Sequence, residues 1–311
     1  MRRILILRGG ALGDFIVTLP ALAALRAAFP TARIELAGNA PAAALAVARG
    51  LLDAAHSQHE SRWSSLYSTT PLPPDFAAFL ASFDLILNFW PDPDADLARR
   101  FPLNPAQRFL TAPALPTQPP AAAHYCAPLH ALGLTPTAFF HSLAPLSVSS
   151  PPGSRLSALN SRLSASFPLA LHPGSGSSNK NWPLAHWLAL IPQLPGPLLI
   201  ILGEAELPVW SALNSTRLSP GLTPHHVGST AVTLAINLPL EDLVTVLHRT
   251  GRFLGHDSGI SHLVAACGVP SLLLFGPTDP AMWSPPAPHV KVIRRGTSLA
   301  SISPTAVLAA L

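Results

Sequence analysis

Short apolar runs alternate with longer amphipathic stretches along the whole chain. Each run is three to seven residues long and is bounded by turn-forming or charged residues, which is typical of a buried strand. The predicted strands cover residues 4–7, 33–37, 83–89, 169–171, 198–202, 235–237 and 271–275. Because strands alternate with helical patterns, the sequence predicts an α/β protein with parallel sheets.

The first helical pattern follows a glycine-rich turn at residues 9–13. Phe15, Leu19, Leu22, Leu25 and Phe29 recur at helical spacing and predict one buried face. A proline at position 20 lies inside this pattern, so we expect the helix to be kinked there. Further helices are predicted at residues 122–134, 155–166, 240–248, 260–267 and 303–311.

The length of the chain suits two domains better than one. It has 311 residues, and a strand–loop–helix start occurs in each half. Residues 147–154 are rich in serine and proline, which is typical of a linker. We therefore expect domains at 1–150 and 151–311, with a boundary within about ten residues of Pro151.

The composition excludes several classes of protein. With 49% hydrophobic and 11% charged residues, the chain is not of the disordered type. The two cysteines give neither a disulfide framework nor metal-ligand spacing. The apolar runs at 4–7 and 263–275 are too short for a signal peptide and a membrane span, respectively. A net charge of +4 without a dense basic run does not indicate nucleic acid, so we expect a soluble, cytoplasmic protein.

The distribution of charged residue types is informative. Seventeen of the nineteen basic residues are arginine, and the only lysines are Lys180 and Lys291. No acidic residue occurs between Asp96 and Glu204. The set of candidate catalytic carboxylates is therefore small.

The stretch 255–285, GHDSGISHLVAACGVPSLLLFGPTDPAMWSP, predicts two loops at the carboxyl ends of neighbouring strands. The first loop, with Asp257, Ser258 and Gly259, opens a helix, whose free N–H groups and dipole favour an anion. His262 and the Gly276–Thr278 turn flank it, and a phosphate-bearing ligand is expected. The alternative is that Asp257 and Ser258 only cap the helix.

A second loop with similar chemistry occurs at residues 172–187, HPGSGSSNKNWPLAHW. Its glycines and serines leave backbone N–H groups free to approach phosphate oxygens, and Lys180 adds a compact positive charge. An ordinary strand-to-helix turn is the alternative. After the strand at 198–202, Glu204 or Glu206 begins the next helix.

The turn at 9–13 also has to be compared with a dinucleotide site. The fingerprint G-x-G-x-x-G would need glycine at position 8, where the sequence has Arg8. Glu35 lies about where a ribose-binding acid would, which leaves that alternative open. Asp14 follows the last glycine of the turn and, taken alone, fits a helix cap.

Two charged features lie between these motifs. The run Asp92-Pro-Asp94-Ala-Asp96 is interpreted as a solvated loop, because its prolines and the lack of further acids disfavour a metal cage. Arginines occur before and after this run, and we consider them as candidate contacts for an anionic acceptor. They are Arg62, Arg99, Arg100 and Arg108.

Three stretches together resemble glycosyltransferase family nine, the ADP-heptose:lipopolysaccharide heptosyltransferases and their relatives. They are the two loops quoted above and RGGALGDFIVTLPALAALRAAFP at residues 8–30, so the resemblance spans most of the chain. It implies a GT-B fold, in which two Rossmann-like domains with parallel sheets face a central cleft. The first domain would hold the acceptor and the second the nucleotide sugar, and the final helix would be free to pack back on the first domain.

The resemblance also implies roles for individual residues. Asp14 would be the catalytic base, and Lys180 would stabilise the departing diphosphate. Glu206 or Glu204 would bind the ribose, and Glu206 fits the family's G-x-x-E pattern better. Donor contacts would come from Gly174, Ser175, Lys180, Glu206, Asp257, Ser258, Gly259, His262, Gly276 and Thr278, and acceptor contacts from Gly13, Asp14 and Arg62. No metal and no cofactor are implied.

The activity implied by the resemblance is an inverting, metal-independent transfer of a heptose from ADP-heptose to a lipid-linked lipopolysaccharide inner-core acceptor. Such a protein would work in the cytoplasm, where it could bind peripherally to the inner membrane. Three alternatives remain open at this point: a relative that uses another nucleotide sugar, an NAD-dependent Rossmann oxidoreductase, and a non-catalytic nucleotide-sugar binding protein.

Overall fold

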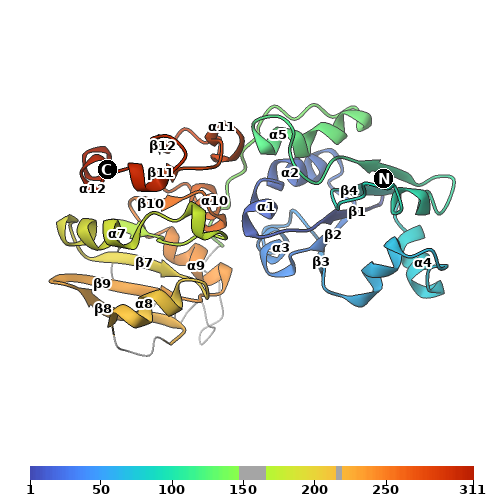
Figure 1. Cartoon of the computed structure of the whole chain (residues 1–311). Coiled ribbons are helices and arrows are strands. Elements are labelled where there is room, and N and C mark those ends of the chain that lie inside the picture. Colours follow the sequence, from blue (N-terminus) through green and yellow to red (C-terminus); the bar gives the residue numbers. More distant parts are fainter. Residues whose placement is uncertain (147–165, 215–218) are drawn as a thin grey trace. The chain divides into compact units, whose positions relative to one another are not determined.

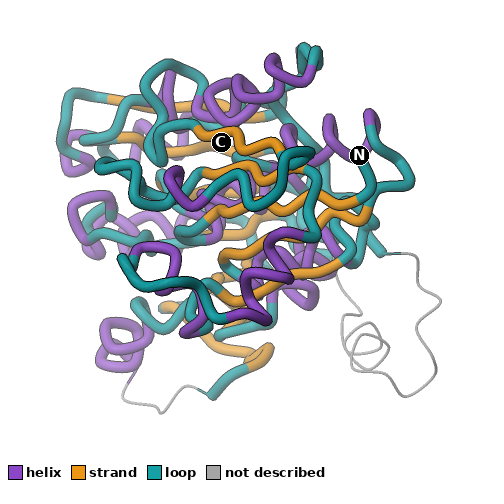
Figure 2. Tube along the Cα trace, turned by 90° about the vertical axis from the view of Figure 1, so that its right-hand side faces the viewer, coloured by secondary structure: helices purple, strands orange, loops and turns teal. Residues whose placement is uncertain are grey.

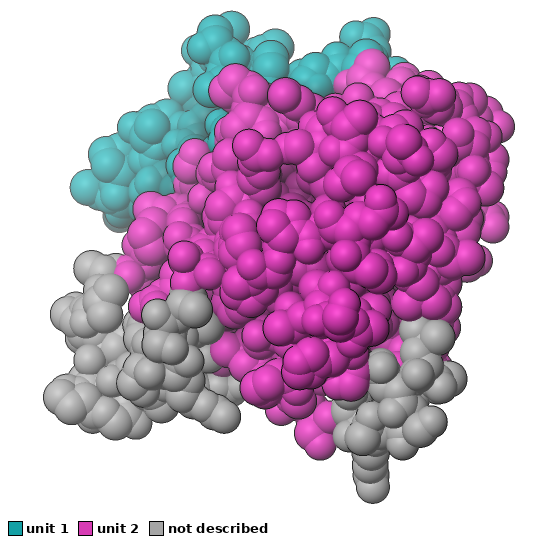
Figure 3. Space-filling view, turned by 90° about the vertical axis from the view of Figure 1, so that its left-hand side faces the viewer, with its two compact units in different colours: residues 1–141 teal, residues 142–311 magenta. Residues whose placement is uncertain are grey.

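A computed structural model of the protein describes residues 1–146, 166–214 and 219–311. The chain divides into two compact units, Met1–His141 and Ser142–Leu311, which Figure 3 colours separately. The linker predicted at 147–154, the boundary expected at Pro151 and all but the last residue of the helix predicted at 155–166 lie outside the described residues. Leu143 already belongs to the second unit, because its N–H donates to the Ala266 carbonyl at 2.7 Å.

The first unit is built on a five-stranded sheet in the order β3-β2-β1-β4-β5, and every neighbouring pair is parallel. Its strands are β1 (Arg3–Arg8), β2 (Arg33–Gly38), β3 (Ala54–Ser57), β4 (Leu85–Asn88) and β5 (Arg108–Thr111). Leu7 of β1 lies between Ala37 of β2 and Asn88 of β4. The central strands β1 and β4 are buried except at Arg3, because apolar residues continue on both of their faces.

Helices connect these strands and lie on both sides of them (Figures 1 and 2). They are α1 (Leu12–Ile16), α2 (Leu19–Ala28), α3 (Ala40–Val47), α4 (Pro74–Ala81) and α5 (Ala121–Cys126), with 3-10 turns η1 (Ser61–Tyr67), η2 (Ala98–Arg100) and η3 (Ala127–Leu132). The kinked helix predicted around Pro20 is wrong, because the chain makes two helices instead. Thr18 ends the first by donating to the Asp14 carbonyl at 2.8 Å, and Pro20 lies in the first turn of the second, where its missing N–H costs nothing.

The second unit contains a seven-stranded sheet in the order β12-β11-β10-β6-β7-β9-β8. Its strands are β6 (Leu169–Leu171), β7 (Leu198–Leu202), β8 (Gly221–Val227), β9 (Thr230–Ile236), β10 (Phe253–His256), β11 (Ser271–Phe275) and β12 (Val290–Arg294). All neighbours are parallel except β8, an edge strand antiparallel to β9. The predicted strand at 235–237 is only the end of β9. The hairpin with β8 was not predicted, because β8 is short of apolar residues and contains Pro224, as edge strands tolerate.

The helices of the second unit are α7 (Leu184–Leu190), α8 (Leu207–Asn214), α9 (Leu240–Leu247), α10 (Gly259–Ala266), α11 (Pro280–Trp283) and α12 (Pro304–Ala310), with η4 (Ser178–Lys180), η5 (Ile191–Gln193) and η6 (Leu299–Ser301). The final helix, α12, packs on α7, and Val307 is buried in the same core as Trp182 and Trp187. Across the described ranges, no helix combines the length and apolarity that a membrane crossing requires.

Both sheets reverse their strand order beside their first strand. The reversal lies between β1 and β4 in the first unit, and between β6 and β10 in the second. In open α/β sheets, ligands bind outside the carboxyl ends of the strands at such a switch point. The predicted α/β class with parallel sheets is confirmed, and each unit has one position where a site is expected.

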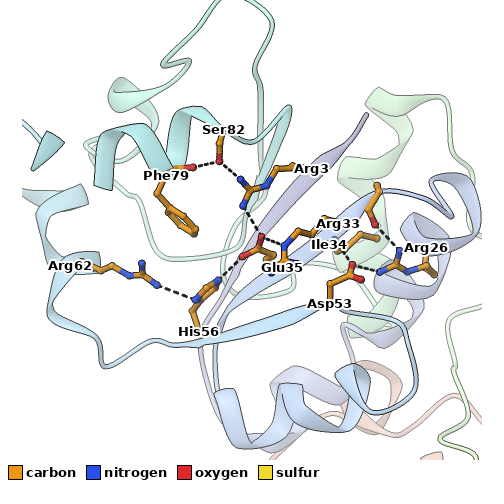
Figure 4. A network of polar contacts seen from close by, with 11 residues as sticks. Arg3, Arg26, Arg33, Ile34, Glu35, Asp53, His56, Arg62, Phe79 and Ser82 are labelled. Carbon is orange, nitrogen blue, oxygen red and sulfur yellow. Dashed lines mark hydrogen bonds and ion pairs between the residues drawn. The ribbon is translucent and has the colours of Figure 1, made fainter. Parts of the chain in front are cut away.

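A buried ionic network ties the middle strands of the first sheet together (Figure 4). Arg3 and Arg33 each donate to Glu35 Oε1 at 2.8 Å. His56 Nε2 lies 2.8 Å from Glu35 Oε2, and His56 Nδ1 accepts from Arg62 Nη2 at 3.0 Å, so the ring proton is assigned to Nε2. Burial by itself would raise the pKa of Glu35, but hydrogen bonds from His56, Arg33 and Arg3 outweigh it and lower the pKa to about 2. The carboxylate is fully engaged, so it is not available to a ribose.

We expect Glu35→Gln to flatten the acid dependence of stability. The folded pKa of Glu35 lies below its unfolded value, so its contribution is complete above about pH 4.5 and is lost as the pH falls toward 2. Over that range the wild-type protein should lose about 3 kcal/mol more unfolding free energy than the variant. Urea unfolding from pH 7 to pH 2.5 measures this difference, with the exposed Glu204→Gln as the matched control. Parallel profiles for wild type and Glu35→Gln would contradict it.

Candidate active site

Lys180 and Asp257 form an ion pair at the switch point of the second sheet. Lys180 ends η4 in the loop after β6, and Asp257 directly follows β10, 77 residues later in the chain. Lys180 Nζ lies 3.1 Å from Asp257 Oδ2. The lysine side chain is 26% exposed and the aspartate 9%, so the ammonium remains accessible while the carboxylate is nearly enclosed.

The loop that carries Lys180 is held by a histidine that the sequence analysis did not single out. His256, the last residue of β10, is fully buried, and its Nε2 accepts the Trp182 N–H at 3.0 Å. The proton is therefore assigned to Nδ1, which lies 3.4 Å from the Gly174 carbonyl. Burial, with a smaller effect of neighbouring His172 in the same direction, lowers the pKa of His256 to about 3. A neutral imidazole thus joins both ends of the loop to β10.

At the start of α10, Ser258 and Asp257 have different roles: only Ser258 caps the helix. Ser258 is the N-cap, and its Oγ accepts the Ser261 N–H at 3.2 Å. Asp257 points to Lys180 instead. Gly259 begins the helix, where the first N–H groups have no partner within the helix and favour an anion. His262 is buried one turn further along α10.

Glu206 reaches back to the loop after β6, whereas Glu204 is exposed. Its Oε2 accepts the Gly203 N–H at 2.7 Å, and its Oε1 lies so close to Gly174 that a Cβ there would be 1.9 Å away. The geometry therefore favours Glu206 over Glu204 as the acid next to the glycine loop. Ser175 stabilises the same loop, since its hydroxyl lies 2.7 Å from Asn181 Oδ1.

A pocket of about 370 Å³ opens beside Glu206. Its walls come from the loop after β6, from α7 and from α8, and include Pro173, Ser177, Asn181, Trp187, Ala205 and Trp210. The buried indole N–H of Trp187 has no hydrogen-bond partner among the described residues. This pocket suits a ring with polar substituents next to a carboxylate.

The turn after β11 provides a third element. Gly276 packs tightly, since a Cβ there would lie 3.0 Å from Leu299 and 3.2 Å from the Thr297 carbonyl oxygen. The hydroxyl of Thr278 is buried and, within the described part of the chain, has no hydrogen-bond partner. A buried unpaired hydroxyl is uncommon and marks a place where a ligand could bind. The described contacts do not join Thr278 to Lys180.

In the first unit, Asp14 lies at the switch point in the turn after β1. It is the third residue of α1, and its Oδ2 accepts the Ala11 N–H at 2.9 Å, so the capping interpretation is correct for one oxygen. Its Oδ1 accepts from Arg8 Nη2 at 3.2 Å. The side chain is 32% exposed, which leaves lone pairs of both oxygens free for a further donor. Gly13, the preceding residue, is helical and accepts the Val17 N–H.

Arg8 holds Asp14 in this position. Its side chain is 5% exposed, its Nε donates to the Thr18 hydroxyl at 3.1 Å, and its guanidinium lies 4.3 Å from the ring centroid of Tyr125. In the sequence, Arg8 stands out only as the residue that interrupts a glycine fingerprint. No local pattern shows that a residue at the end of a strand will pair with one six positions later.

The other predicted residues of the first unit have structural partners. Arg62 forms an ion pair with Glu60 at 2.8 Å, contacts His56 and lies over the Trp63 and Phe79 rings. Its described contacts do not include Asp14.

Asp92 accepts the N–H groups of Leu97 and Ala98, so it orders the 92–98 loop. Within the described residues, no three His, Cys, Asp or Glu side chains are placed to hold a metal ion.

Comparison with known proteins finds a family model and curated proteins that are similar to parts of the chain. Residues 154–303 match the model of "Glycosyltransferase family 9 (heptosyltransferase)". Lipopolysaccharide heptosyltransferase 1 of Salmonella typhimurium is 33% identical over 104 residues, which are 33% of this chain and 30% of that relative. The alignment thus spans under a third of the curated relative.

Two solved structures show the same fold over nearly all of their length. The glycosyl transferase family 9 protein of Veillonella parvula has a TM-score of 0.75 at 19% identity and covers 99% of this chain and 95% of its own. Heptosyltransferase WaaC of E. coli, solved with ADP, has a TM-score of 0.67 at 18% identity, with coverage of 99% and 96%. The fold is therefore GT-B, as predicted. The sequence match identifies residues 154–303 as a glycosyltransferase family 9 domain, and the solved structures show that the whole chain has the fold of such enzymes.

Proposed function

We propose that the protein is an inverting, metal-independent glycosyltransferase that moves a heptose from ADP-heptose to a lipopolysaccharide inner-core acceptor, in the cytoplasm at the inner membrane face. The observation that carries this proposal is the Lys180–Asp257 ion pair at the carboxyl ends of β6 and β10. The relatives support the choice of donor. E. coli WaaC was solved with ADP and with ADP-2-deoxy-2-fluoro heptose, and the curated relative is named a lipopolysaccharide heptosyltransferase.

The second unit would bind the donor. The diphosphate would lie between Lys180 Nζ and the N–H groups at Ser258 and Gly259, where the α10 dipole adds to the attraction. Asp257 holds the ammonium in place before the donor arrives and would accept hydrogen bonds from sugar hydroxyls. Glu206 would bind the ribose hydroxyls, and Gly174, Ser175, His262, Gly276 and Thr278 would complete the surroundings.

The first unit would bind the acceptor through Gly13, Asp14 and Arg62. The Asp14 carboxylate takes the proton of the acceptor hydroxyl, whose oxygen attacks the anomeric carbon on the face opposite the diphosphate. The bond between that carbon and the diphosphate oxygen breaks, and ADP leaves with the electron pair. One displacement of this kind inverts the anomeric configuration, and its transition state resembles an oxocarbenium ion.

The charges explain how this transfer could proceed without a metal. Negative charge grows on the leaving diphosphate, and a preorganised cation and amide dipoles stabilise it most where water is excluded. Lys180 is one of only two lysines in the chain, and the nearly enclosed Asp257 fixes its position. A compact ammonium can follow the phosphate oxygens as the bond lengthens, which a planar guanidinium does less well.

We expect Gly174→Ala to weaken nucleotide binding and to destabilise the second unit. A Cβ at this position would lie 1.9 Å from Glu206 Oε1, so either the glutamate or the loop must move. The matched control is Gly176→Ala in the same loop, where a Cβ meets nothing within 4 Å. Overpacking should lower the unfolding free energy of Gly174→Ala by about 1–3 kcal/mol and weaken its ADP binding at least tenfold. Gly176→Ala should change neither the unfolding free energy nor the ADP affinity by much. Urea unfolding and ADP calorimetry measure both effects, and equal behaviour of the two variants would remove Gly174 and Glu206 from the donor site.

We expect Asp14→Asn to lose turnover by roughly 10²–10⁴ while its ADP affinity stays within twofold, since the proposed ADP contacts lie in the second unit. Loss of the charged cap should cost about 1 kcal/mol of stability, so the assays are run well below the melting temperature. Asp75→Asn, an exposed acid in the first turn of α4, is the control. Heptose transfer from ADP-heptose and ADP binding are measured on the same purified variants. Transfer by Asp14→Asn at the wild-type rate would exclude Asp14 as the base.

A further inference from the structure

Gly10 lies in the turn between β1 and the proposed base, in close contact with the base itself. Its φ is +102°, a conformation that residues with a side chain rarely adopt. A Cβ at this position would lie 2.5 Å from Asp14 Oδ2, so the carboxylate packs directly against this glycine. A side chain that contacts Gly10 from another loop is therefore a close neighbour of the Asp14 carboxylate.

Two amide side chains from other loops hold Gly10 by its peptide groups. Gln58 directly follows β3, and its Oε1 accepts the Gly10 N–H at 3.3 Å. Asn39 directly follows β2, and its Nδ2 donates to the Gly10 carbonyl at 3.3 Å. Because β1, β2 and β3 are parallel neighbours, their carboxyl ends lie at one edge of the sheet, which brings both amides to the turn.

The two amides differ in the hydrogen bonds that they can still make. Asn39 is the N-cap of α3, and its Oδ1 accepts the Ala42 N–H at 3.1 Å, so both ends of its amide are engaged. Gln58 uses only its oxygen, and because that oxygen faces the Gly10 N–H, Nε2 is assigned to the other side of the amide. No residue in the described ranges accepts a hydrogen bond from this nitrogen, and the side chain is half-buried. Gln58 can therefore donate to a ligand without releasing the turn.

The charges beside Gln58 determine which kind of group can bind there. Asp14 is the only charged residue in the turn at 9–14. The cation next to it, Arg8, is nearly enclosed and donates to Asp14 and to the Thr18 hydroxyl. A carboxylate or phosphate at Gln58 Nε2 would meet the Asp14 charge and find no basic residue in the turn to offset it. An uncharged hydroxyl or ether oxygen accepts from the amide without this repulsion.

We propose that Gln58 is a specificity-determining residue for the acceptor, in which Nε2 donates to an uncharged oxygen of the accepting sugar close to the hydroxyl that Asp14 deprotonates. The inference rests on the proposed function, since it takes Asp14 as the base, and it deepens that function by naming the acceptor group that is recognised. Oε1 of the same amide keeps Gly10 in place. One side chain thus joins recognition of the acceptor to the turn that carries the base.

Transfer to a series of modified acceptors tests this assignment in the full-length protein. An O-deacylated inner-core acceptor is compared with analogues of its accepting sugar, each lacking one oxygen other than the accepting hydroxyl, at saturating ADP-heptose. We expect the wild-type protein to use one analogue with a kcat/KM at least tenfold lower than that of the parent acceptor, because Nε2 is left without an acceptor atom. In Gln58→Met, which keeps the length of the side chain without its amide, this ratio should fall to within about threefold. Asn39→Ala removes the other contact with Gly10 and should keep the wild-type ratio.

The ratio between acceptors separates recognition by Gln58 from support of the turn. A displaced Asp14 would lower transfer to every acceptor alike and leave the ratio unchanged. Equal ratios in Gln58→Met and wild type, an absence of discrimination by the wild type, or an equal loss of discrimination in Asn39→Ala would each overturn the assignment. Transfer with unaltered ratios would refute this inference alone. A wild-type protein that transfers no heptose to the parent acceptor would refute the proposed function, and this inference with it.

Discussion

The contact between Lys180 and Asp257 joins the two loops on which the second unit's candidate site depends. Each residue follows a different strand, so the pair forms only when β6 and β10 lie side by side in the sheet. His256 reinforces the same connection through Trp182 and Gly174, and it does so as a neutral ring that keeps its hydrogen bonds at any pH well above 3. An ion pair as accessible as this one adds little stability by itself. Its importance lies in fixing one cation where charge would develop.

The first unit solves a similar problem with different residues. A base has to be held in position and yet remain accessible. Asp14 meets both conditions, because Arg8 donates to its Oδ1 and the Ala11 N–H donates to its Oδ2, and each oxygen can still accept a further hydrogen bond. Tyr125 supports Arg8 from α5, and its hydroxyl donates to the Ala114 carbonyl. The position of the proposed base therefore depends on this aromatic ring.

Local sequence patterns predicted most of the central strands and the loops that follow them. β7 and β11 have the predicted bounds, because a short apolar run between breakers can be little else than a buried strand. The split between α1 and α2 and the edge strand β8 were not predicted, since both depend on hydrogen bonds made in the folded chain. His256 was missed because its partners Trp182 and Gly174 are distant in the sequence. Arg8 was missed because no local pattern shows that it pairs with Asp14 across the turn. Asp14 stood out only because its motif resembles a known family, whereas Lys180 was also indicated by its glycine- and serine-rich loop and by the scarcity of lysine in the chain.

Calorimetric titration of ADP tests the central claim most directly, using the two lysines of the chain as a matched pair. Lys180→Ala should weaken ADP binding roughly 10–100-fold, and Lys180→Arg should also bind more weakly, because a planar fork replaces a compact charge in a tight loop. Lys291→Ala removes the same charge from an exposed position in β12 and should bind ADP as tightly as the wild-type protein does. The wild-type protein should bind ADP more tightly than NAD. Equal ADP affinity in Lys180→Ala and Lys291→Ala, or a wild-type preference for NAD, would contradict the account.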